Sequence, residues 1–380
     1  MSGDDQTPAR TGEFQLQKRE ILTPGHEDAA ESSRLATNPD HYPEPGSFDA
    51  ELKRARQCFG RFRDAGRQMI DDVRVGRPLN TVAVAEPLEE VVASIIRHPD
   101  PMVWMTHLLE PQSFLNGHLL RTSVLAAVLG RGMGLSEVQL KRLAWSGLLC
   151  QIGKAKLPRH LLEKPGPLTE EEITRIHTFV NTGAELVARQ PDLDAEIAEI
   201  VRTHHERFDG SGYPNGLKAD QIPMLARLVG IVDWYDTMTS IKPYSDVVVT
   251  STEAIDALNQ ERDRRFHDQV VEEFVRVIGL YPNGSLVELD SGEIGVVQAQ
   301  NVKNRTQPRL LLMLDEKQQK IEPPQALDLL SYNQDPSKDP KTIHRALPDG
   351  EFGLDPATAI ANLADAQGFL AKLRKLRGKT

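Results

Sequence analysis

The 380-residue sequence is poor in cysteine and aromatic residues and has no excess of positive charge. Its two cysteines, Cys58 and Cys150, provide no disulfide framework. The formal net charge of −10 argues against a general nucleic-acid-binding protein, because phosphate backbones select basic surfaces. The charge does not exclude a small basic pocket that binds a nucleotide.

Long apolar runs are also missing. No stretch approaches the length of a membrane span, and the first residues lack the basic and apolar regions of a secretory signal. We therefore expect a cytoplasmic protein with no membrane span.

The first half of the chain predicts helices behind a polar segment. Residues 1–46 are rich in Asp, Glu, Pro, Gly, Ser and Thr, which predicts a disordered N-terminal segment. Residues 47–112 form a helical lead-in, with helices expected from Phe48 to Val75 and from Leu88 to Ile96.

The next part, residues 113–283, predicts a succession of helices. Ser136 with Gln139 and Thr169 with Glu172 have the spacing of capping boxes, which mark helix starts. Further helical stretches are expected at 194–207, 222–240, 252–260 and 266–279.

The pattern changes after Pro282. Residues 285–288 and 294–297 flank a probable turn, and Arg309 to Leu314 predicts another strand, so residues 284–332 form a small β appendage. Residues 333–380 predict a loop and a final helix that begins at Asp355. The expected fold is mainly α, a helical bundle with a small C-terminal β appendage.

Histidines carry the clearest chemical signal. Five of the 11 histidines fall between His118 and His205. Asp233 lies in an otherwise apolar helical stretch, where a buried carboxylate is costly unless a partner such as a cation compensates it. Imidazole and carboxylate ligands from several helices build many two-metal sites. Each histidine taken alone also fits a surface or hydrogen-bonded residue, and the adjacent His204 and His205 need not serve one site.

The order of the motifs adds a family resemblance. The chain contains LCQIGK at 149–154, LEKPGPLT at 162–169, HHERFDGSGYP at 204–214 and VDWYDTMTS at 232–240. This succession, spanning roughly residues 94–281, resembles the HD-GYP family, whose members hydrolyse the bacterial second messenger cyclic di-GMP. The β appendage also resembles the tail of one HD-GYP subfamily. The resemblance implies an HD-type helical bundle.

The resemblance also implies roles for single residues. The positions that match metal ligands are His118, His177, His204, His205 and Asp233. The implied cation is iron or manganese, at no more than partial occupancy.

Two lysines match positions that contact substrate phosphate. Lys154 corresponds to a lysine that borders the metal site, and Lys242 keeps the positive charge of a phosphate-holding segment. Ser245 stands where a second basic residue is usual.

Gly212, Tyr213 and Pro214 match the family's signature loop. The resemblance implies a surface for a protein partner such as a diguanylate cyclase domain, with Tyr213 as an exposed aromatic anchor. A tight surface loop explains the same turn-forming residues, and the sequence does not separate the two interpretations.

The sequence departs from the family at the His-Asp dyad, where it has Cys150 and Gln151. In the family this aspartate bridges two metals. Gln151 is neutral and cannot supply the bridging charge. Cys150 as a thiolate would suit a soft or borderline metal, but we favour a small buried apolar residue. Phe114 stands where three-metal members have a glutamate.

These departures favour a degenerate HD-GYP protein that regulates cyclic di-GMP signalling by binding the ligand or a partner. The first alternative is an active phosphodiesterase with an unorthodox site. The second is an interaction scaffold that binds neither metal nor nucleotide.

Overall fold

A computed structural model of the protein describes residues 41–109, 114–164, 166–240, 249–348, 350–354 and 356. Of the segment predicted to be disordered, residues 1–46, residues 1–40 lie outside these ranges, whereas the hydroxyl of Tyr42 in the described part donates to the carbonyl oxygen of Leu135 at 2.6 Å. The predicted helix that begins at Asp355 also lies outside them, apart from Pro356. None of the helices in the described ranges is both long enough and apolar enough to cross a membrane.

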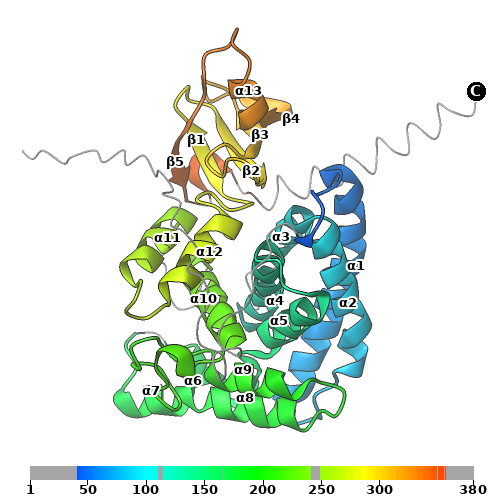
Figure 1. Cartoon of the computed structure of the whole chain (residues 1–380), viewed down its shortest axis with the longest axis vertical. Helices are drawn as coiled ribbons and strands as arrows, with labels where there is room; N and C mark the ends of the chain where they lie inside the picture. The colour runs from blue at the N-terminus through cyan, green and yellow to red at the C-terminus, as the bar shows by residue number, and fades with distance from the viewer. Residues whose placement is uncertain are drawn as a thin grey trace, which may run out of the picture. The chain divides into compact units, whose positions relative to one another are not determined.

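The described chain is mainly helical up to residue 278, as the sequence predicts (Figure 1). The helices are α1 (Phe48–Arg74), α2 (Val82–Arg97), α3 (Pro99–Thr106), α4 (Phe114–Gly132), α5 (Glu137–Leu149), α6 (Arg159–Leu162), α7 (Glu170–His177), α8 (Phe179–Ala188), α9 (Ala195–Thr203), α10 (Met224–Thr239), α11 (Ser251–Gln260) and α12 (Asp268–Ile278).

Helix starts follow the capping signals. Ser136 and Thr169 both accept a hydrogen bond from the backbone N–H three residues later, which confirms the two predicted capping boxes. Helix α2 was predicted to begin at Leu88, but it begins at Val82 and contains Pro87. The apolar spacing of Val84, Leu88 and Val91, all fully buried, continues across the proline.

Helices α4, α5 and α10 contribute to the apolar core around the candidate functional site. Leu119 of α4, Leu148 of α5 and Val229 of α10 are completely buried in one apolar cluster. Gly147 allows α4 and α5 to approach closely, because a Cβ there would lie 2.7 Å from the carbonyl oxygen of Thr122. The close approach of the α4 and α5 backbones therefore fixes the position of the residues that follow α5. These residues, Cys150 and Gln151, contact Asp233 of α10.

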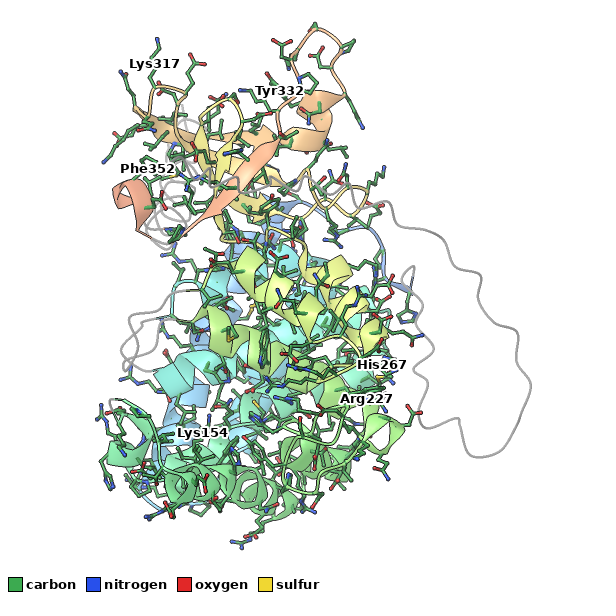
Figure 2. All side chains as sticks on the ribbon, turned by 90° about the vertical axis from the view of Figure 1, so that its left-hand side faces the viewer. Lys154, Arg227, His267, Lys317, Tyr332 and Phe352 are labelled. Atoms are coloured by element: carbon green, nitrogen blue, oxygen red, sulfur yellow. The ribbon has the colours of Figure 1, made fainter. Side chains whose placement is uncertain are left out.

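The C-terminal part is one antiparallel sheet with strand order β4-β3-β2-β1-β5. Its elements are β1 (Leu286–Leu289), β2 (Ile294–Ala299), β3 (Arg309–Leu314), β4 (Lys320–Asp328), helix α13 (Leu329–Asn333) and β5 (Ile343–Leu347). Lys317, in the turn between β3 and β4, and Tyr332 of α13 both belong to this part (Figure 2).

Both faces of the sheet are covered. Leu286 and Val296 belong to the same apolar cluster as the helices, whereas Val287 and Val297 pack with Leu329 of α13. The indole N–H of Trp104 in α3 donates to the carbonyl oxygen of Val297, 3.0 Å away. The sheet is therefore bonded to the helical part as well as packed on it.

Strands β1, β2 and β3 confirm the predicted hairpin and third strand, but the sheet extends further than predicted. Residues 343–347 were expected to be loop and form β5 instead, paired with β1. The sequence missed β4 and β5 because both are edge strands. Edge strands are largely exposed, and β4 carries Pro323 and Pro324, which are tolerated only at edges.

Candidate functional site

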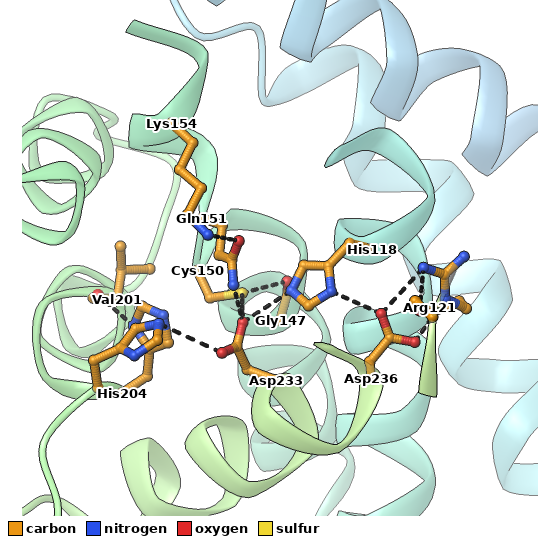
Figure 3. Close-up of polar contacts among 12 residues, drawn as sticks. His118, Arg121, Gly147, Cys150, Gln151, Lys154, Val201, His204, Asp233 and Asp236 are labelled. Atoms are coloured by element: carbon orange, nitrogen blue, oxygen red, sulfur yellow. Dashed lines mark hydrogen bonds and ion pairs between the residues drawn. The ribbon is translucent and has the colours of Figure 1, made fainter. Parts of the chain in front are cut away.

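The candidate site lies where the ends of α5 and α9 meet α4 and α10 (Figure 3). His118 lies on α4, Cys150 and Gln151 follow α5, His204 follows α9, and Asp233 is on α10. A Cβ on Gly230 would lie 2.4 Å from the carbonyl oxygen of His204. The glycine thus lets α10 pass directly against the histidine pair and brings Asp233, one turn later, to the centre.

Asp233 is a buried acceptor whose Oδ1 atom is already surrounded by donors. It is 2% exposed. Oδ1 accepts hydrogen bonds from the Gln151 amide and from Nε2 of His118, the latter at 2.9 Å. Burial alone would raise the pKa of Asp233, but the hydrogen bond from His118 and the nearby histidines hold it well below its usual value.

His118 links two carboxylates. Its Nδ1 atom lies 2.7 Å from Oδ2 of Asp236, and its Nε2 atom contacts Asp233. A carboxylate only accepts, so both ring nitrogens carry hydrogen and the ring is an imidazolium. Burial lowers the pKa of His118, but hydrogen bonds to Asp233 and Asp236 raise it above its usual value. Arg121 extends this hydrogen-bond network by donating to Asp236 at 2.6 Å.

Cys150 is fully buried, in agreement with the prediction of a small buried residue. Its thiol donates to the carbonyl oxygen of Gly147 at 3.1 Å and lies 3.8 Å from Oδ1 of Asp233. Burial and the charge of Asp233 raise the pKa of the Cys150 thiol well above its usual value. The sulfur is therefore a neutral donor here rather than a thiolate.

The other oxygen of Asp233, Oδ2, faces the histidine pair. Nδ1 of His204 donates to the carbonyl oxygen of Val201 at 2.7 Å, which leaves the lone pair on Nε2. Burial lowers the pKa of His204 to about 4, and burial and His204 lower the pKa of His205 well below its usual value. Both rings are neutral, the state that ligates metals.

The donor set of His204, His205 and Asp233 fits a cation. Within the described ranges, neither Nε2 atom has a hydrogen-bond partner, and Nε2 of His205 lies 3.4 Å from Oδ2 of Asp233. The three ligand atoms lie within 4.8 Å of one another. Two imidazoles and one carboxylate suit iron(II) and similar ions, and the Val201 carbonyl orients one ring as is usual for metal-bound histidines. His118, Cys150 and Asp233 form a second compact group, but it is internally hydrogen-bonded.

Lys154 borders the site, as the resemblance implies. Its ammonium donates to Oε1 of Gln151 and lies 4.7 Å from the centre of the Phe179 ring. Burial lowers the pKa of Lys154 from its usual value. Gln151 thereby connects a cation to Asp233, donating to the carboxylate with its amide N–H and accepting from the lysine with its carbonyl oxygen.

His177 belongs to neither compact group. Its ring stacks on Tyr213 at a centroid distance of 3.7 Å, and the other face of Tyr213 stacks on His205 at 4.8 Å. The prediction that Tyr213 is an exposed anchor was therefore wrong: its ring is half-buried between two histidines. Gly212 explains the position, since a Cβ there would lie 2.4 Å from the His205 carbonyl oxygen.

Lys242 and Ser245 lie outside the described ranges, and so does the side chain of Phe114.

Three residues of the site were missed by the sequence analysis. Arg121 and Asp236 each follow a candidate ligand by three residues on its helix, a spacing that shares one face and was the available signal. Glu206 was missed because it has no such spacing. It is 4% exposed and accepts from the backbone N–H groups of Asn215 and Leu217, which holds the signature loop against the histidine pair.

This chain is similar to several known proteins. A family model described as an HD domain matches residues 104–270. Cyclic di-GMP phosphodiesterase PA4108 of Pseudomonas aeruginosa is 31% identical over 285 residues, which is 74% of this chain and 68% of that protein. The cyclic di-GMP phosphodiesterase response regulator RpfG of Xanthomonas campestris pv. campestris is 33% identical, over 42% of each chain. Bd1817, an HDG"Y"P protein from Bdellovibrio bacteriovorus, matches with a TM-score of 0.49 and 18% identity, over 59% of this chain and 71% of that chain.

The match to PA4108 covers more than two thirds of both proteins, whereas this chain spans less than half the length of RpfG. The protein is an HD domain protein. Within that class it belongs to the HD-GYP family, so the resemblance is confirmed at the level of the family.

Proposed function

We propose that this protein is a regulator in cyclic di-GMP signalling that keeps the HD-GYP fold but has little phosphodiesterase activity. One observation carries the proposal: Oδ1 of Asp233 is engaged by the neutral amide of Gln151 and by His118. In the family, a second carboxylate at the position of Gln151 bridges two metals. This chain has an amide there, so an anionic bridge between two cations is missing.

A single cation is the expected complement. His204, His205 and Oδ2 of Asp233 would hold it, because their ligand atoms converge and neither Nε2 atom has a hydrogen-bond partner within the described ranges. When bound, a divalent cation supplies one positive centre for a phosphate oxygen. Efficient hydrolysis in the family needs a second metal to clamp the developing charge, and the loss of one such contribution commonly costs about 10²–10³ in rate.

We also propose that this site still binds cyclic di-GMP. Lys154 presents an ammonium at the rim, held by Gln151 and Phe179, where a phosphate oxygen of cyclic di-GMP would be neutralised. PA4108 and RpfG are named for cyclic di-GMP, and two Vibrio cholerae relatives are named for 3'3'-cGAMP, which supports a cyclic dinucleotide as the ligand class and cyclic di-GMP as the first member to test. Calorimetric titration with cyclic di-GMP tests this: saturable binding excludes a scaffold without a ligand, and its absence overturns the ligand assignment.

Protein partners would meet the signature loop on its exposed residues. Asp209, Ser211 and Asn215 are exposed, whereas Tyr213 is enclosed by two rings. We therefore assign contact with a partner such as a diguanylate cyclase domain to these polar residues. Asn215→Ala should weaken co-purification of the partner while metal content stays unchanged, and an unchanged partner yield would contradict the assignment.

The second candidate function is an active phosphodiesterase that uses Cys150 as a ligand. It is favoured by the names of the relatives and by the compact group of His118, Cys150 and Asp233. It requires that Cys150→Ala abolish both metal uptake and turnover. Cys58→Ala is the matched control, because Cys58 is also buried but lies in α1, away from the site. Unchanged turnover in Cys150→Ala would exclude this candidate.

A further inference from the structure

A small cavity lies next to the histidine pair, and His204 is part of its lining. Its lining includes Arg207, Arg227, Arg265, Phe266 and His267. Arg227 and His267 lie together on the face of the helical part seen in Figure 2. The cavity volume is about 20 Å³, enough to enclose a water-sized group such as one or two oxygens of a larger anion.

The chain is built so that positive charges converge on this cavity. The backbone N–H of Phe208 donates to the carbonyl oxygen of Arg265 at 3.0 Å, and that of Asp209 donates to Arg264 at 2.9 Å. These two bonds fasten the segment that carries Arg207 to the segment that carries Arg265. Arg227 enters from the first turn of α10.

Two of these guanidinium groups have no acidic partner. Arg207 is 5% exposed, and its Nη1 atom donates only to the carbonyl oxygens of His204 and Glu206. Among the residues that the structure describes, no carboxylate forms an ion pair with Arg207 or Arg265. A buried charge without a counter-charge is costly.

The neighbouring arginines Arg262 and Arg264, in contrast, do form ion pairs with carboxylates. Nε of Arg262 lies 2.6 Å from Oδ1 of Asp268, and Arg264 pairs with Glu261. Among the described residues, the exposed Asp220 is the one carboxylate that pairs with Arg227, at 3.2 Å, and Nε of Arg227 donates to the carbonyl oxygen of Ile222 at 2.9 Å. Among the described residues that line the cavity, Glu206 is the only acid, and its two oxygens accept from the signature loop. The cavity therefore has a surplus of positive charge.

Two further features suit an anion. The Arg207 guanidinium lies over the Phe266 ring, 5.1 Å from its centre, which fixes its plane. Nδ1 of His267 accepts from the backbone N–H of Gln269 at 3.2 Å, so the ring hydrogen is on Nε2, as a donor. Planar guanidinium groups bind tetrahedral oxyanions through paired hydrogen bonds.

We propose that the cavity between Arg207 and Arg265 is an anion site that binds a phosphate group, separate from the Lys154 side of the candidate metal centre. The ligand class is inorganic phosphate or a phosphate monoester. This site does not depend on whether the protein hydrolyses cyclic di-GMP.

The test is calorimetric titration of the full chain with inorganic phosphate, in a chloride buffer of constant ionic strength. We expect saturable binding that weakens at least tenfold in Arg265→Gln, since hydrogen bonds to charged groups are worth about 1.5–3 kcal/mol. Arg264→Gln is the matched control, because this neighbouring arginine is exposed and already paired. It should bind phosphate like the wild type.

Lys154→Gln separates the two phosphate sites. If phosphate binding is lost in Lys154→Gln but retained in Arg265→Gln, the proposal is overturned. Absence of saturable binding in the wild type overturns it as well. Arg265→Lys is the second variant should Arg265→Gln fail to fold. It keeps the charge without the planar fork, and unchanged affinity in it would contradict bidentate binding.

Titration with guanosine 5′-monophosphate then identifies the source of the phosphate. Tighter binding than inorganic phosphate assigns the site to a nucleotide phosphate. Equal binding assigns it to free phosphate, and both results support the site.

Discussion

Asp233 lies at the centre of the candidate site, and its two oxygens have different surroundings. Oδ1 accepts from His118 and Gln151, whereas Oδ2 faces the neutral imidazole of His205. The imidazolium of His118 and the guanidinium of Arg121 neutralise Asp233 and Asp236 from within the chain.

Single glycines provide a test of the packing that positions this site. Gly147→Ala should destabilise the protein by about 1–3 kcal/mol, because its Cβ would collide with the backbone of α4. Gly60→Ala in α1 is the matched control: nothing lies within 4 Å of its Cβ, so it should stabilise the helix by about 0.5–1 kcal/mol. Urea unfolding of both variants measures this, and equal effects would contradict the described packing of α4 and α5.

At the scale of elements, a buried carboxylate joins α1 to α2. Glu51 is 3% exposed and accepts from Ser94 at 2.8 Å and from Nε of Arg97 at 2.9 Å. Burial alone would raise the pKa of Glu51, but these hydrogen bonds and the Arg97 charge lower it. A lowered folded-state pKa gives stability that is present above the unfolded-state pKa and is lost as the pH falls through the folded-state value.

Glu51→Gln should therefore cost about 1.5–3 kcal/mol of unfolding free energy at pH 7, because it removes charge-assisted hydrogen bonds. The difference from wild type should shrink as the pH falls from 7 to below the usual Glu pKa of about 4.3 and through the lower folded-state pKa of Glu51. Urea unfolding at both ends of this range measures it. If the difference in unfolding free energy between wild type and Glu51→Gln stays constant with pH, the Glu51 charge contributes nothing to stability.

Most elements of the fold could be predicted from local signals. The capping boxes at Ser136 and Thr169 place two helix starts, and strand β3 has the predicted bounds. The candidate site could be predicted only as a set of residue types. His177 stacks on Tyr213 and lies apart from the other candidate ligands. This position depends on how the loop after α9 folds back, which no local sequence pattern encodes.

At the scale of the whole molecule, the sheet and the helices share one core. Leu286 and Leu311 of the sheet belong to the same apolar cluster as the helical residues, and Asn283 donates to the buried Asp100 of α3 at 2.7 Å. Calorimetric unfolding of the protein should therefore show one cooperative transition for the helices and the sheet together. Leu286→Ala should lower its midpoint as a whole, with a cost of about 2–5 kcal/mol. A separate early transition for the sheet would contradict a shared core.

The central claim is that the chain lacks the anionic bridge of a two-metal site, and metal analysis of the purified protein combined with a cyclic di-GMP hydrolysis assay tests it most directly. We expect at most one divalent cation per wild-type chain and hydrolysis at least about 10²-fold slower than in active relatives. The double substitution Cys150→His with Gln151→Asp should raise the metal content towards two. Two tightly bound cations in the wild-type protein, together with hydrolysis at the rate of those relatives, would contradict the account.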